Sequence, residues 1–361
     1  MKIGIIGSGQ LGWMMMLESY NLPLEFYMLD NEPGPASYMA RRFFKPDNYK
    51  EFVDSCDYVT YEFEHVDGRT LEYADKTQKL RPGLRSVELK RDRSIEKDFL
   101  RSINVPEADY EKADNFNEAL KIAREKGDAV IKTCAGGYDG KGQFYVHNSD
   151  ISRFSELDVP GRFIVEDFIN YDVEASIIAV RNDSGKFVFF EPSFNYNRNG
   201  ILIYNIAPFN DKKSEMQEIA KKIMNELNYI GTMGIEFYIE NGKVLVNEIA
   251  PRVHNTGHHT LKGSSISQFQ EHIRAISNIN VIEPELYKPS GIVNIIGRGI
   301  DDIYNDLLNV SDDIYWYKKS EVRRKRKMGH VNITGESYKN VNDKVNKILN
   351  MLYMGRLDDF I

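Results

Sequence analysis

Apolar residues at the start of the chain form short runs separated by polar turns and a helical stretch. The runs at residues 2–6, 25–29 and 58–61 are short and apolar, as buried strands are. After the first run, GSGQLG makes a glycine turn, and residues 13–17 continue as a helix. This order of strand, turn and helix predicts one half of a doubly wound, Rossmann-like α/β domain, and we place its end near residue 95.

The next segment combines a helical period with a glycine-rich loop. Apolar residues recur at helical spacing from 114 to 127, and the stripe ends at a glycine, as helices often do. Strands are predicted at residues 129–132 and 144–146, and the loop between them contains four glycines. This pattern predicts a small α+β lid.

The second half of the chain alternates longer helices with strands. Helical stripes cover residues 216–227 and 266–276, and a final helix is predicted near residues 341–352. Strands predicted at residues 234–240 and 244–249 flank Asn241-Gly242. We therefore expect a β-hairpin between the first two helices.

The composition is that of a globular protein without a general affinity for polyanions. Of the 361 residues, 42% are hydrophobic and 28% are charged, and the formal net charge is −7. Only two cysteines occur, the first residues read as a strand and not as a signal peptide, and no apolar stretch approaches the roughly 20 residues that span a bilayer. We expect a cytoplasmic protein that enters no membrane and binds no nucleic acid.

The first glycine turn is a weak signal for a nucleotide. Gly7-Ser8-Gly9-Gln10-Leu11-Gly12 fits GxGxxG after a strand, which brings backbone N–H groups and a helix N-terminus to a phosphate. Asp30 ends the second strand about 20 residues further on, where a dinucleotide fold places its ribose ligand. A nicotinamide-dependent dehydrogenase is one interpretation. The other is that the glycines only let the strand and helix pack closely.

A second glycine-rich segment, Gly136-Gly137-Tyr138-Asp139-Gly140-Lys141-Gly142, gives a flexible backbone rich in donors that can close over phosphates. It does not have Walker spacing. Lys132, at the end of the preceding strand, and Lys141 can both direct positive charge toward the same phosphates. The alternative is an ordinary hairpin turn with solvated charges.

Carboxylates gather on the predicted hairpin, with Glu236 on its first strand and Asn247-Glu248 on its second. Two glutamates and an asparagine amide suit Mg²⁺, which prefers a few carboxylates together with substrate phosphates. Both glutamates must lie on one face of the sheet, which requires that the residue numbers of paired positions add up to an even number, as 236 and 248 do. A loop with an odd number of residues gives such pairs, so we predict a three- or five-residue loop at Asn241-Gly242. The alternative is a solvated acidic hairpin that holds no metal.

Histidines and basic residues cluster in two further places. His254, His258 and His259 have no cysteine partners, so we prefer hydrogen bonds from His254 and Asn255 to a polar substrate over a zinc site. The tract at residues 318–327 is densely basic without interleaved aromatic residues. This favours a grip on one substrate phosphate over nucleic-acid binding.

Together these motifs resemble the ATP-grasp superfamily, and within it the 5-(carboxyamino)imidazole ribonucleotide synthase family of purine biosynthesis. The resemblance covers nearly the whole chain through GSGQLG, TYEFEHV, RDRSIEK, KTCAGGYDGKGQ, EASIIAVR, NEIAPRVHNTGHHT, SISQFQEHIRAI and RKMGHVNITG. It implies a mixed α/β and α+β ATP-grasp fold in four units: a Rossmann-like pre-ATP-grasp domain (1–95), a lid subdomain (96–168), a catalytic subdomain (169–290) and a C-terminal β-rich unit that binds substrate phosphate (291–361).

The resemblance also implies the reaction. ATP phosphorylates bicarbonate to carboxyphosphate, which carboxylates the exocyclic amine of 5-aminoimidazole ribonucleotide, with release of ADP and phosphate. A lid that excludes water suits this chemistry, because bicarbonate is a poor electrophile and carboxyphosphate hydrolyses quickly. A homodimer is implied as well. The alternatives are a formate-using ATP-grasp ribonucleotide transformylase and, more remotely, an NAD(P)-dependent dehydrogenase.

The residues that match the family's motifs fall into three implied groups. The implied ATP contacts are the glycine-rich segment Gly136 to Gly142 together with Arg93, Lys132, Glu166, Asp167, Phe168, Ile169, Glu174, Asn197 and Asn247. The implied contacts of the imidazole ribonucleotide and bicarbonate are Gly9, Gln10, Leu11, Glu62, Tyr138, Asp139, Arg252, His254, Asn255, Arg326 and Lys327. Glu236 and Glu248 are the implied magnesium ligands.

The implied catalytic residues are Tyr138, Asp139, Arg252 and Lys327. Asp139 is the candidate that orients or deprotonates the attacking amine, because a carboxylate can accept its hydrogen bond.

The chain departs from the family's pattern in several places. Asn197 stands where a histidine that contacts ATP is common, and asparagine can donate a hydrogen bond but carries no charge. Trp13 and Cys134 replace arginines, and Arg324-Lys325 replaces Pro-Gly. We therefore expect the substrate phosphate to be held in a somewhat different way.

Overall fold

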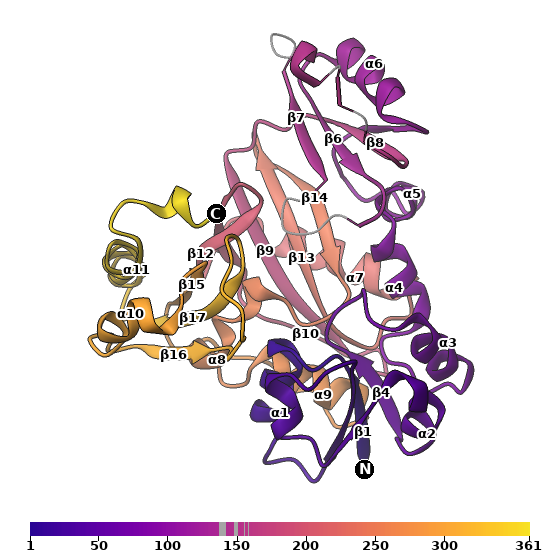
Figure 1. The fold of residues 1–361 in the computed structure, drawn as a ribbon, viewed down its shortest axis with the longest axis vertical. Helices are drawn as coiled ribbons and strands as arrows, with labels where there is room; N and C mark the ends of the chain where they lie inside the picture. Colours follow the sequence, from indigo (N-terminus) through magenta and orange to yellow (C-terminus); the bar gives the residue numbers. More distant parts are fainter. Residues whose placement is uncertain (137–141, 148–150, 155, 158) are drawn as a thin grey trace.

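The computed structural model describes residues 1–136, 142–147, 151–154, 156–157 and 159–361, and these residues form three β-sheets. Figure 1 shows the lid at the top, the N-terminal domain at the bottom and the C-terminal helices at the left, all arranged around the largest sheet. None of the described helices has both the length and the apolar character needed to cross a membrane.

The N-terminal domain is built on a parallel sheet in the order β3-β2-β1-β4. Its strands are β1 (Lys2–Ile6), β2 (Glu25–Leu29), β3 (Arg42–Phe44) and β4 (Tyr58–Tyr61), and its helices are α1 (Gln10–Glu18), α2 (Tyr49–Asp54), α3 (Gly68–Lys76) and α4 (Leu84–Arg91). The predicted strands β1, β2 and β4 are confirmed at both ends. Strand β3 was not predicted, because three residues give too short a pattern to read.

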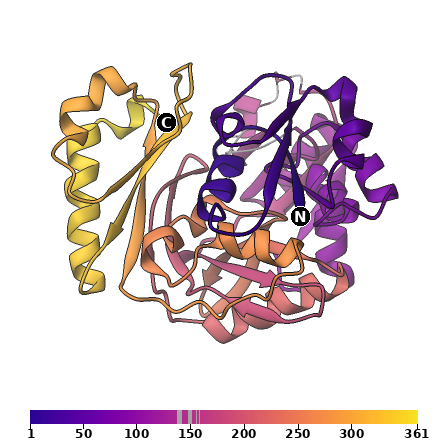
Figure 2. The same ribbon diagram turned by 90° about the horizontal axis from the view of Figure 1, so that it is seen from below.

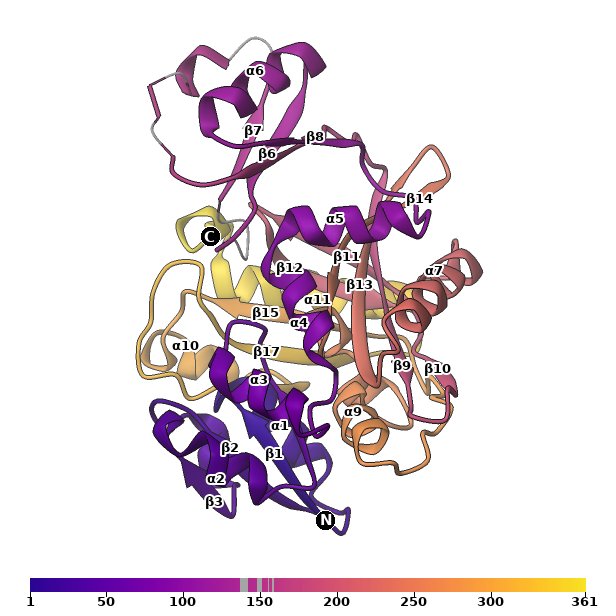
Figure 3. The same ribbon diagram turned by 90° about the vertical axis from the view of Figure 1, so that its right-hand side faces the viewer.

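The lid is a small antiparallel sheet in the order β5-β8-β6-β7, covered by one helix. Its elements are β5 (Tyr110–Ala113), α6 (Phe116–Lys126), β6 (Ala129–Thr133), β7 (Gln143–Val146) and β8 (Phe163–Asp167). The predicted helix is confirmed, and it ends at Gly127, whose φ of 95° favours glycine. Helix α5 (Arg93–Ser102) follows α4, and in Figure 3 the two run from the N-terminal domain toward the lid.

The largest sheet is antiparallel and, within the described residues, has the order β14-β13-β9-β11-β12-β15-β17-β16, with β10 also paired to β9. Its strands are β9 (Val173–Arg181), β10 (Phe187–Phe189), β11 (Ser193–Arg198), β12 (Ile201–Ala207), β13 (Gly231–Glu240), β14 (Lys243–Ala250), β15 (Ser290–Ile296), β16 (Asp313–Trp316) and β17 (Lys327–Thr334). The C-terminal strands continue this sheet because β15 pairs with β12.

Helices cover both faces of the largest sheet. They are α7 (Lys213–Glu226), α8 (Thr260–Gly263), α9 (Gln268–Ile276), α10 (Ile300–Leu307) and α11 (Tyr338–Tyr353). Helix α7 packs on the face of β9 that carries Ile177, whereas Ile178 on the opposite face shares a cluster with Ala275 of α9. Helix α11 covers β15 and β17. The helices predicted at 216–227, 266–276 and 341–352 are thus confirmed, within a few residues at each end.

Helix α9 also fixes the N-terminal domain on the rest of the molecule. Met14 and Met15 of α1 are fully buried in the same apolar cluster as Phe269 and Ile273 of α9. Figure 2 shows the indigo N-terminal strands next to the orange segment that contains α9. This packing brings the turn at the start of α1 to the central cavity.

The hairpin of β13 and β14 has a different loop from the predicted one. Glu240 pairs with Lys243, so Asn241-Gly242 is a two-residue loop, with φ values of 49° and 76° that match the primed turns of tight hairpins. The prediction of a three- or five-residue loop was wrong. Glu236 and Glu248 nevertheless lie on one face of the sheet, as predicted. The register shifts between Glu236 and Phe237, and Glu248 therefore pairs directly with Glu236. A β-bulge at Asn247 supplies the extra residue.

Candidate active site

A cavity of about 990 Å³ lies between the N-terminal domain, the lid, the largest sheet and the C-terminal strands. Of the predicted site residues that the structure describes, all line this cavity except Gly136 and Gly142. The predicted residues Gly137, Tyr138, Asp139, Gly140 and Lys141 lie outside the described residues. Segments far apart in the sequence therefore contribute to one chamber.

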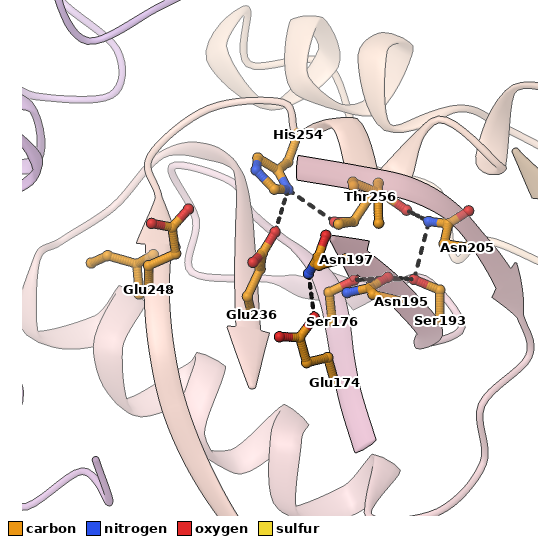
Figure 4. Close-up of polar contacts among 12 residues, drawn as sticks. Glu174, Ser176, Ser193, Asn195, Asn197, Asn205, Glu236, Glu248, His254 and Thr256 are labelled. Carbon is orange, nitrogen blue, oxygen red and sulfur yellow. Dashed lines mark hydrogen bonds and ion pairs between the residues drawn. The ribbon is translucent and has the colours of Figure 1, made fainter. Parts of the chain in front are cut away.

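Glu236 and Glu248 meet across the hairpin at the floor of this cavity. One oxygen of each carboxylate and a ring nitrogen of His254 lie within 4.8 Å of one another, from adjoining elements (Figure 4). The two side chains are 17% and 39% exposed, so they are accessible from the cavity without being fully hydrated. Two carboxylates with the Asn247 amide beside them form the hard oxygen donor set that Mg²⁺ prefers, and the residues present fit this ion.

The histidine of this cluster is held within the protein. His254 Nδ1 lies 2.9 Å from Thr256 Oγ1 and 3.8 Å from Glu236 Oε1. Burial, and then the nearby Arg252, lower the pKa of His254 to about 3, so the ring is neutral at pH 7. A neutral ring adds no positive charge that would compete with a cation for the glutamates.

The two glutamates have different electrostatic surroundings. Burial opposes ionisation of Glu248, but the Lys90 ammonium, 3.2 Å from Glu248 Oε2, and the nearby Arg93 are among the positive charges that together lower its pKa. Burial and the charge of Glu248 both raise the pKa of Glu236. Lys90 also lies 3.4 Å from Glu96 Oε2. Lys90 was not predicted, because nothing in the local sequence of α4 indicates a hairpin about 150 residues away. Glu96 was not predicted either, although it belongs to the RDRSIEK motif.

A second cluster of charges lies where the lid meets α5. Lys132 Nζ is 2.6 Å from Glu166 Oε2, and Lys97 Nζ is 3.1 Å from Glu166 Oε1. Burial opposes ionisation of Glu166, but the two lysines together lower its pKa to about 2. Lys132, which was predicted to face phosphates, is therefore anchored by a carboxylate. Lys97 was not predicted as a site residue, although it belongs to the RDRSIEK motif.

Arg93 joins the start of α5 to the beginning of the glycine-rich segment. Its Nη1 donates to the Thr133 carbonyl at 2.7 Å, and its backbone N–H donates to the Cys134 carbonyl at 2.8 Å. Thr133 also donates its backbone N–H to the Gly142 carbonyl at 2.9 Å. These bonds fix the residues that come just before the glycine-rich segment, and its last glycine, relative to the start of α5.

The connector between β8 and β9 forms another wall of the cavity. Phe168, 36% exposed, and Ile169 line it, and the rings of Tyr171 and Tyr238 stack 4.6 Å apart. The Asn197 amide donates a hydrogen bond to the Glu174 carboxylate (Figure 4). Asparagine at position 197 thus orients Glu174 without adding charge.

The turn at the start of α1 is already occupied by a carboxylate of the protein. Glu62 accepts hydrogen bonds from the backbone N–H groups of Gly9 at 2.6 Å and Gly12 at 2.9 Å. Asp30 accepts from the Ser8 backbone N–H and hydroxyl. Both features that suggested a dinucleotide are thus satisfied internally, so a pyrophosphate would have to displace the Glu62 carboxylate, which is partly buried. The dehydrogenase interpretation does not fit this geometry.

Arg252 and His254 are held by two buried residues that were not predicted. Arg252 Nε donates to Glu64 Oε2 at 2.7 Å, and their side chains are 11% and 4% exposed. Gln268, which is fully buried, accepts from the His254 backbone N–H at 2.9 Å and donates to its carbonyl at 2.6 Å. Glu64 and Gln268 belong to the TYEFEHV and SISQFQEHIRAI motifs, which were the available signal for both.

The remaining two histidines of the cluster bond to nearby protein atoms. His259 Nδ1 lies 2.9 Å from the Thr256 carbonyl, and His258 Nδ1 lies 3.3 Å from Gln268 Nε2. Both rings are buried. His259 therefore belongs to the packing beneath the cavity, whereas His258 is one of the residues that line it.

The basic tract contributes a subset of its residues to the cavity. Residues 323–327 and Lys319 line it on the side of the C-terminal strands. Lys319 Nζ donates to the Lys327 carbonyl at 2.8 Å, and Arg326 Nη1 lies 3.1 Å from Glu321 Oε2. A cationic wall thus faces the two glutamates across the cavity.

Three protein families match successive parts of the chain. Residues 1–91 match the ribonucleotide synthetase preATP-grasp domain, residues 98–269 the ATP-grasp domain, and residues 290–344 the phosphoribosylaminoimidazole carboxylase C-terminal domain. These matches accord with the mixed α/β architecture of the described sheets.

Individual relatives extend over nearly the full length. The chain is 48% identical to the N5-carboxyaminoimidazole ribonucleotide synthase of Saccharolobus solfataricus, over 99% of this chain and 97% of the relative. It is 41% identical to the protein of the same name from Aquifex aeolicus, over 98% and 97% of the two chains. The crystal structure of N5-carboxyaminoimidazole synthetase from Staphylococcus aureus, complexed with ADP, superposes with a TM-score of 0.91 at 30% identity, over 96% of each chain.

Proposed function

The chain belongs to the family of N5-carboxyaminoimidazole ribonucleotide synthases, and we propose that its central cavity holds ATP, bicarbonate and 5-aminoimidazole ribonucleotide side by side. It is an ATP-dependent ligase that carboxylates the exocyclic amine of this ribonucleotide. The walls of the cavity offer residues for each part of that reaction.

In this proposal, the nucleotide lies between the lid and the hairpin. Phe168 and Ile169 line the wall suited to the base, and Glu174, oriented by Asn197, faces the ribose. Lys132 lines the part of the cavity suited to the phosphates, and the glycine-rich segment remains our candidate for further phosphate contacts. Glu236 and Glu248, with Asn247 beside them, would hold Mg²⁺, whose charge offsets that of the transferring phosphoryl group.

We propose that the carboxyl transfer takes place between the hairpin and the basic wall. A bicarbonate oxygen attacks the γ-phosphorus of ATP, and ADP leaves with the electron pair of the broken P–O bond. The amine nitrogen then attacks the carboxyl carbon of carboxyphosphate, phosphate leaves, and the amine loses a proton. Arg252, fixed by Glu64, can stabilise the anionic carboxyl group, and Arg326 and Lys327 can hold the ribonucleotide phosphate.

Asp139 and Tyr138 remain our candidates beside the amine, with Asp139 accepting its proton. An Asp139→Asn variant should bind ATP with unchanged affinity but form no carboxylated product. Normal turnover by this variant would remove Asp139 from the mechanism.

The observation that carries the assignment is the direct pairing of Glu236 with Glu248 in a cavity whose opposite wall is cationic. The test is phosphate release from ATP and magnesium with each combination of bicarbonate, formate and 5-aminoimidazole ribonucleotide. We expect turnover that requires the ribonucleotide and rises with bicarbonate. Turnover that requires formate instead would support a transformylase and overturn the choice of donor.

We further propose that the enzyme acts in the cytoplasm as a homodimer. Both cysteines are unpaired and buried, which suits a reducing compartment. Sedimentation velocity tests the dimer, and a single monomeric species at working concentrations would contradict it.

A further inference from the structure

The residues after α11 return to the wall of the cavity. Leu357–Asp359 form one turn of 3-10 helix, and Ile361 is fully buried in a small apolar cluster with Ile201, Ile203 and Ile296. In Figure 1 this yellow segment ends beside β12. We call residues 357–361 the strap.

One side of the strap is bonded to the basic loop, residues 318–327. Arg324 Nε donates to the main-chain oxygen of Ile361 at 2.8 Å, and Arg324 Nη2 donates to the Asp358 carbonyl at 3.1 Å. The Lys325 backbone N–H donates to the Phe360 carbonyl at 2.8 Å. Three hydrogen bonds thus fix the part of the loop that lies directly before Arg326 and Lys327.

The other side of the strap is bonded to the hairpin of β11 and β12. Asp358 pairs with Arg198 at 2.6 Å, next to the tip formed by Asn199-Gly200. This tip lines the cavity, and the neighbouring Asn197 holds Glu174. The strap is therefore bonded to a loop on the phosphate side of the cavity and to a hairpin on the nucleotide side.

The sequence at the loop matches this role. Arg324 supplies two of the three bonds through its guanidinium group, and an apolar side chain could make neither of them. Lys325 has a φ of 67°, a left-handed conformation in which glycine would fit with less strain. The chain thus keeps a strained residue here while gaining two side-chain bonds to the strap.

We propose that the strap is a positioning element that sets the basic loop and the β11–β12 tip at a fixed separation across the cavity. This inference rests on the proposed role of Arg326 and Lys327 in holding the ribonucleotide phosphate. The strap itself touches no substrate. It acts through the loop, and its loss should weaken ribonucleotide binding more than it slows the chemical step.

The experiment compares steady-state kinetics of Arg324→Met, a deletion of residues 357–361, and Arg326→Ala. We expect Arg324→Met and the deletion to raise the KM for the ribonucleotide about fivefold or more, with kcat within about twofold of the wild type. Asp358→Ala, which breaks only the bond to Arg198, should raise the KM for ATP instead. The matched control is Glu336→Ala, which breaks an exposed pair with Lys288 elsewhere in the C-terminal unit and should change neither KM.

The outcomes separate the strap from the loop. If Arg326→Ala raises the KM for the ribonucleotide while the deletion does not, the strap proposal is wrong. If Arg324→Met raises it and the deletion does not, Arg324 acts by touching substrate, and the proposal again fails. If Arg326→Ala has no effect, the assigned role of the loop is wrong. In that case, amide hydrogen exchange still tests whether the strap holds the loop. Residues 318–327 should exchange faster in the deletion variant than in the wild type. Unchanged exchange would refute the strap proposal.

Discussion

Replacing Lys90 with methionine tests the charge balance at the two glutamates. The ammonium lies 3.2 Å from Glu248 Oε2 and 3.4 Å from Glu96 Oε2. At an effective dielectric constant of about 20, unit charges at these separations attract by about 5 kcal/mol each. Desolvation offsets much of this attraction, and water screens the Glu248 contact because that side chain is 39% exposed.

We therefore expect Lys90→Met to lower the free energy of unfolding by roughly 3 kcal/mol, mainly because Glu96, 5% exposed, loses its cationic partner. Mg²⁺ brings positive charge to the same cluster. Magnesium should therefore raise the free energy of unfolding of Lys90→Met by more than it raises that of the wild type. Lys90→Arg keeps the charge and is the matched control.

The assay is urea unfolding of the three proteins, in EDTA and with magnesium chloride. In EDTA, the wild type and Lys90→Arg should have a higher free energy of unfolding than Lys90→Met. In magnesium, the difference in free energy between these proteins should be smaller. The reasoning is refuted if Lys90→Met is as stable as the wild type in EDTA, or if magnesium stabilises all three proteins equally.

Three further substitutions test other parts of the molecule. Gln268→Met leaves the His254 backbone N–H without its partner and leaves the His254 carbonyl with the Gly257 N–H alone, so it should cost roughly 2 kcal/mol of unfolding free energy and lower kcat/KM; an unchanged urea midpoint would contradict this. Lys97→Met frees one oxygen of Glu166 and should raise the KM for ATP with little change in the KM for the ribonucleotide; equal changes in both would count against it. Burial raises the pKa of Glu271 to about 7 from an ordinary 4.5, so its stabilising contribution is full below pH 4.5 and is lost as the pH rises through 7. Relative to Glu271→Gln, the wild type should therefore lose roughly 2 to 3 kcal/mol of unfolding free energy between pH 5 and pH 8, and parallel pH profiles would show that Glu271 titrates normally.

The strands of the N-terminal domain and of the hairpin could be predicted because each has a continuous local pattern. The hairpin loop could not, because a β-bulge is a property of two strands. Glu236 can be brought opposite Glu248 either by a loop with an odd number of residues or by one extra residue in a strand. The prediction that the two glutamates share a face is confirmed. The extra residue is Asn247, and the residues of the turn give no sign of it.

The site residues that were missed share one physical reason. Lys90 and Gln268 act through contacts with residues distant in the sequence or through backbone atoms. The SISQFQEHIRAI motif marks the segment that holds Gln268, but it does not show which atoms the amide contacts. Glu62 shows the reverse limitation. It was predicted to bind substrate, and in the structure its carboxylate caps the turn at Gly9 and Gly12. Motif matching indicates that such a residue matters, whereas only coordinates show what its oxygens contact.

The assignment of Glu236 and Glu248 as the magnesium ligands is tested most directly by calorimetric titration of ADP, with and without magnesium, into the wild type and the Glu236→Gln, Glu248→Gln double variant. In the wild type, magnesium should tighten ADP binding by about tenfold or more, because the carboxylates and the phosphates share the ion. Without magnesium, ADP should bind the double variant at least as tightly as it binds the wild type. Adding magnesium should leave the affinity of the double variant for ADP almost unchanged. Equal tightening by magnesium in both proteins would contradict the assignment.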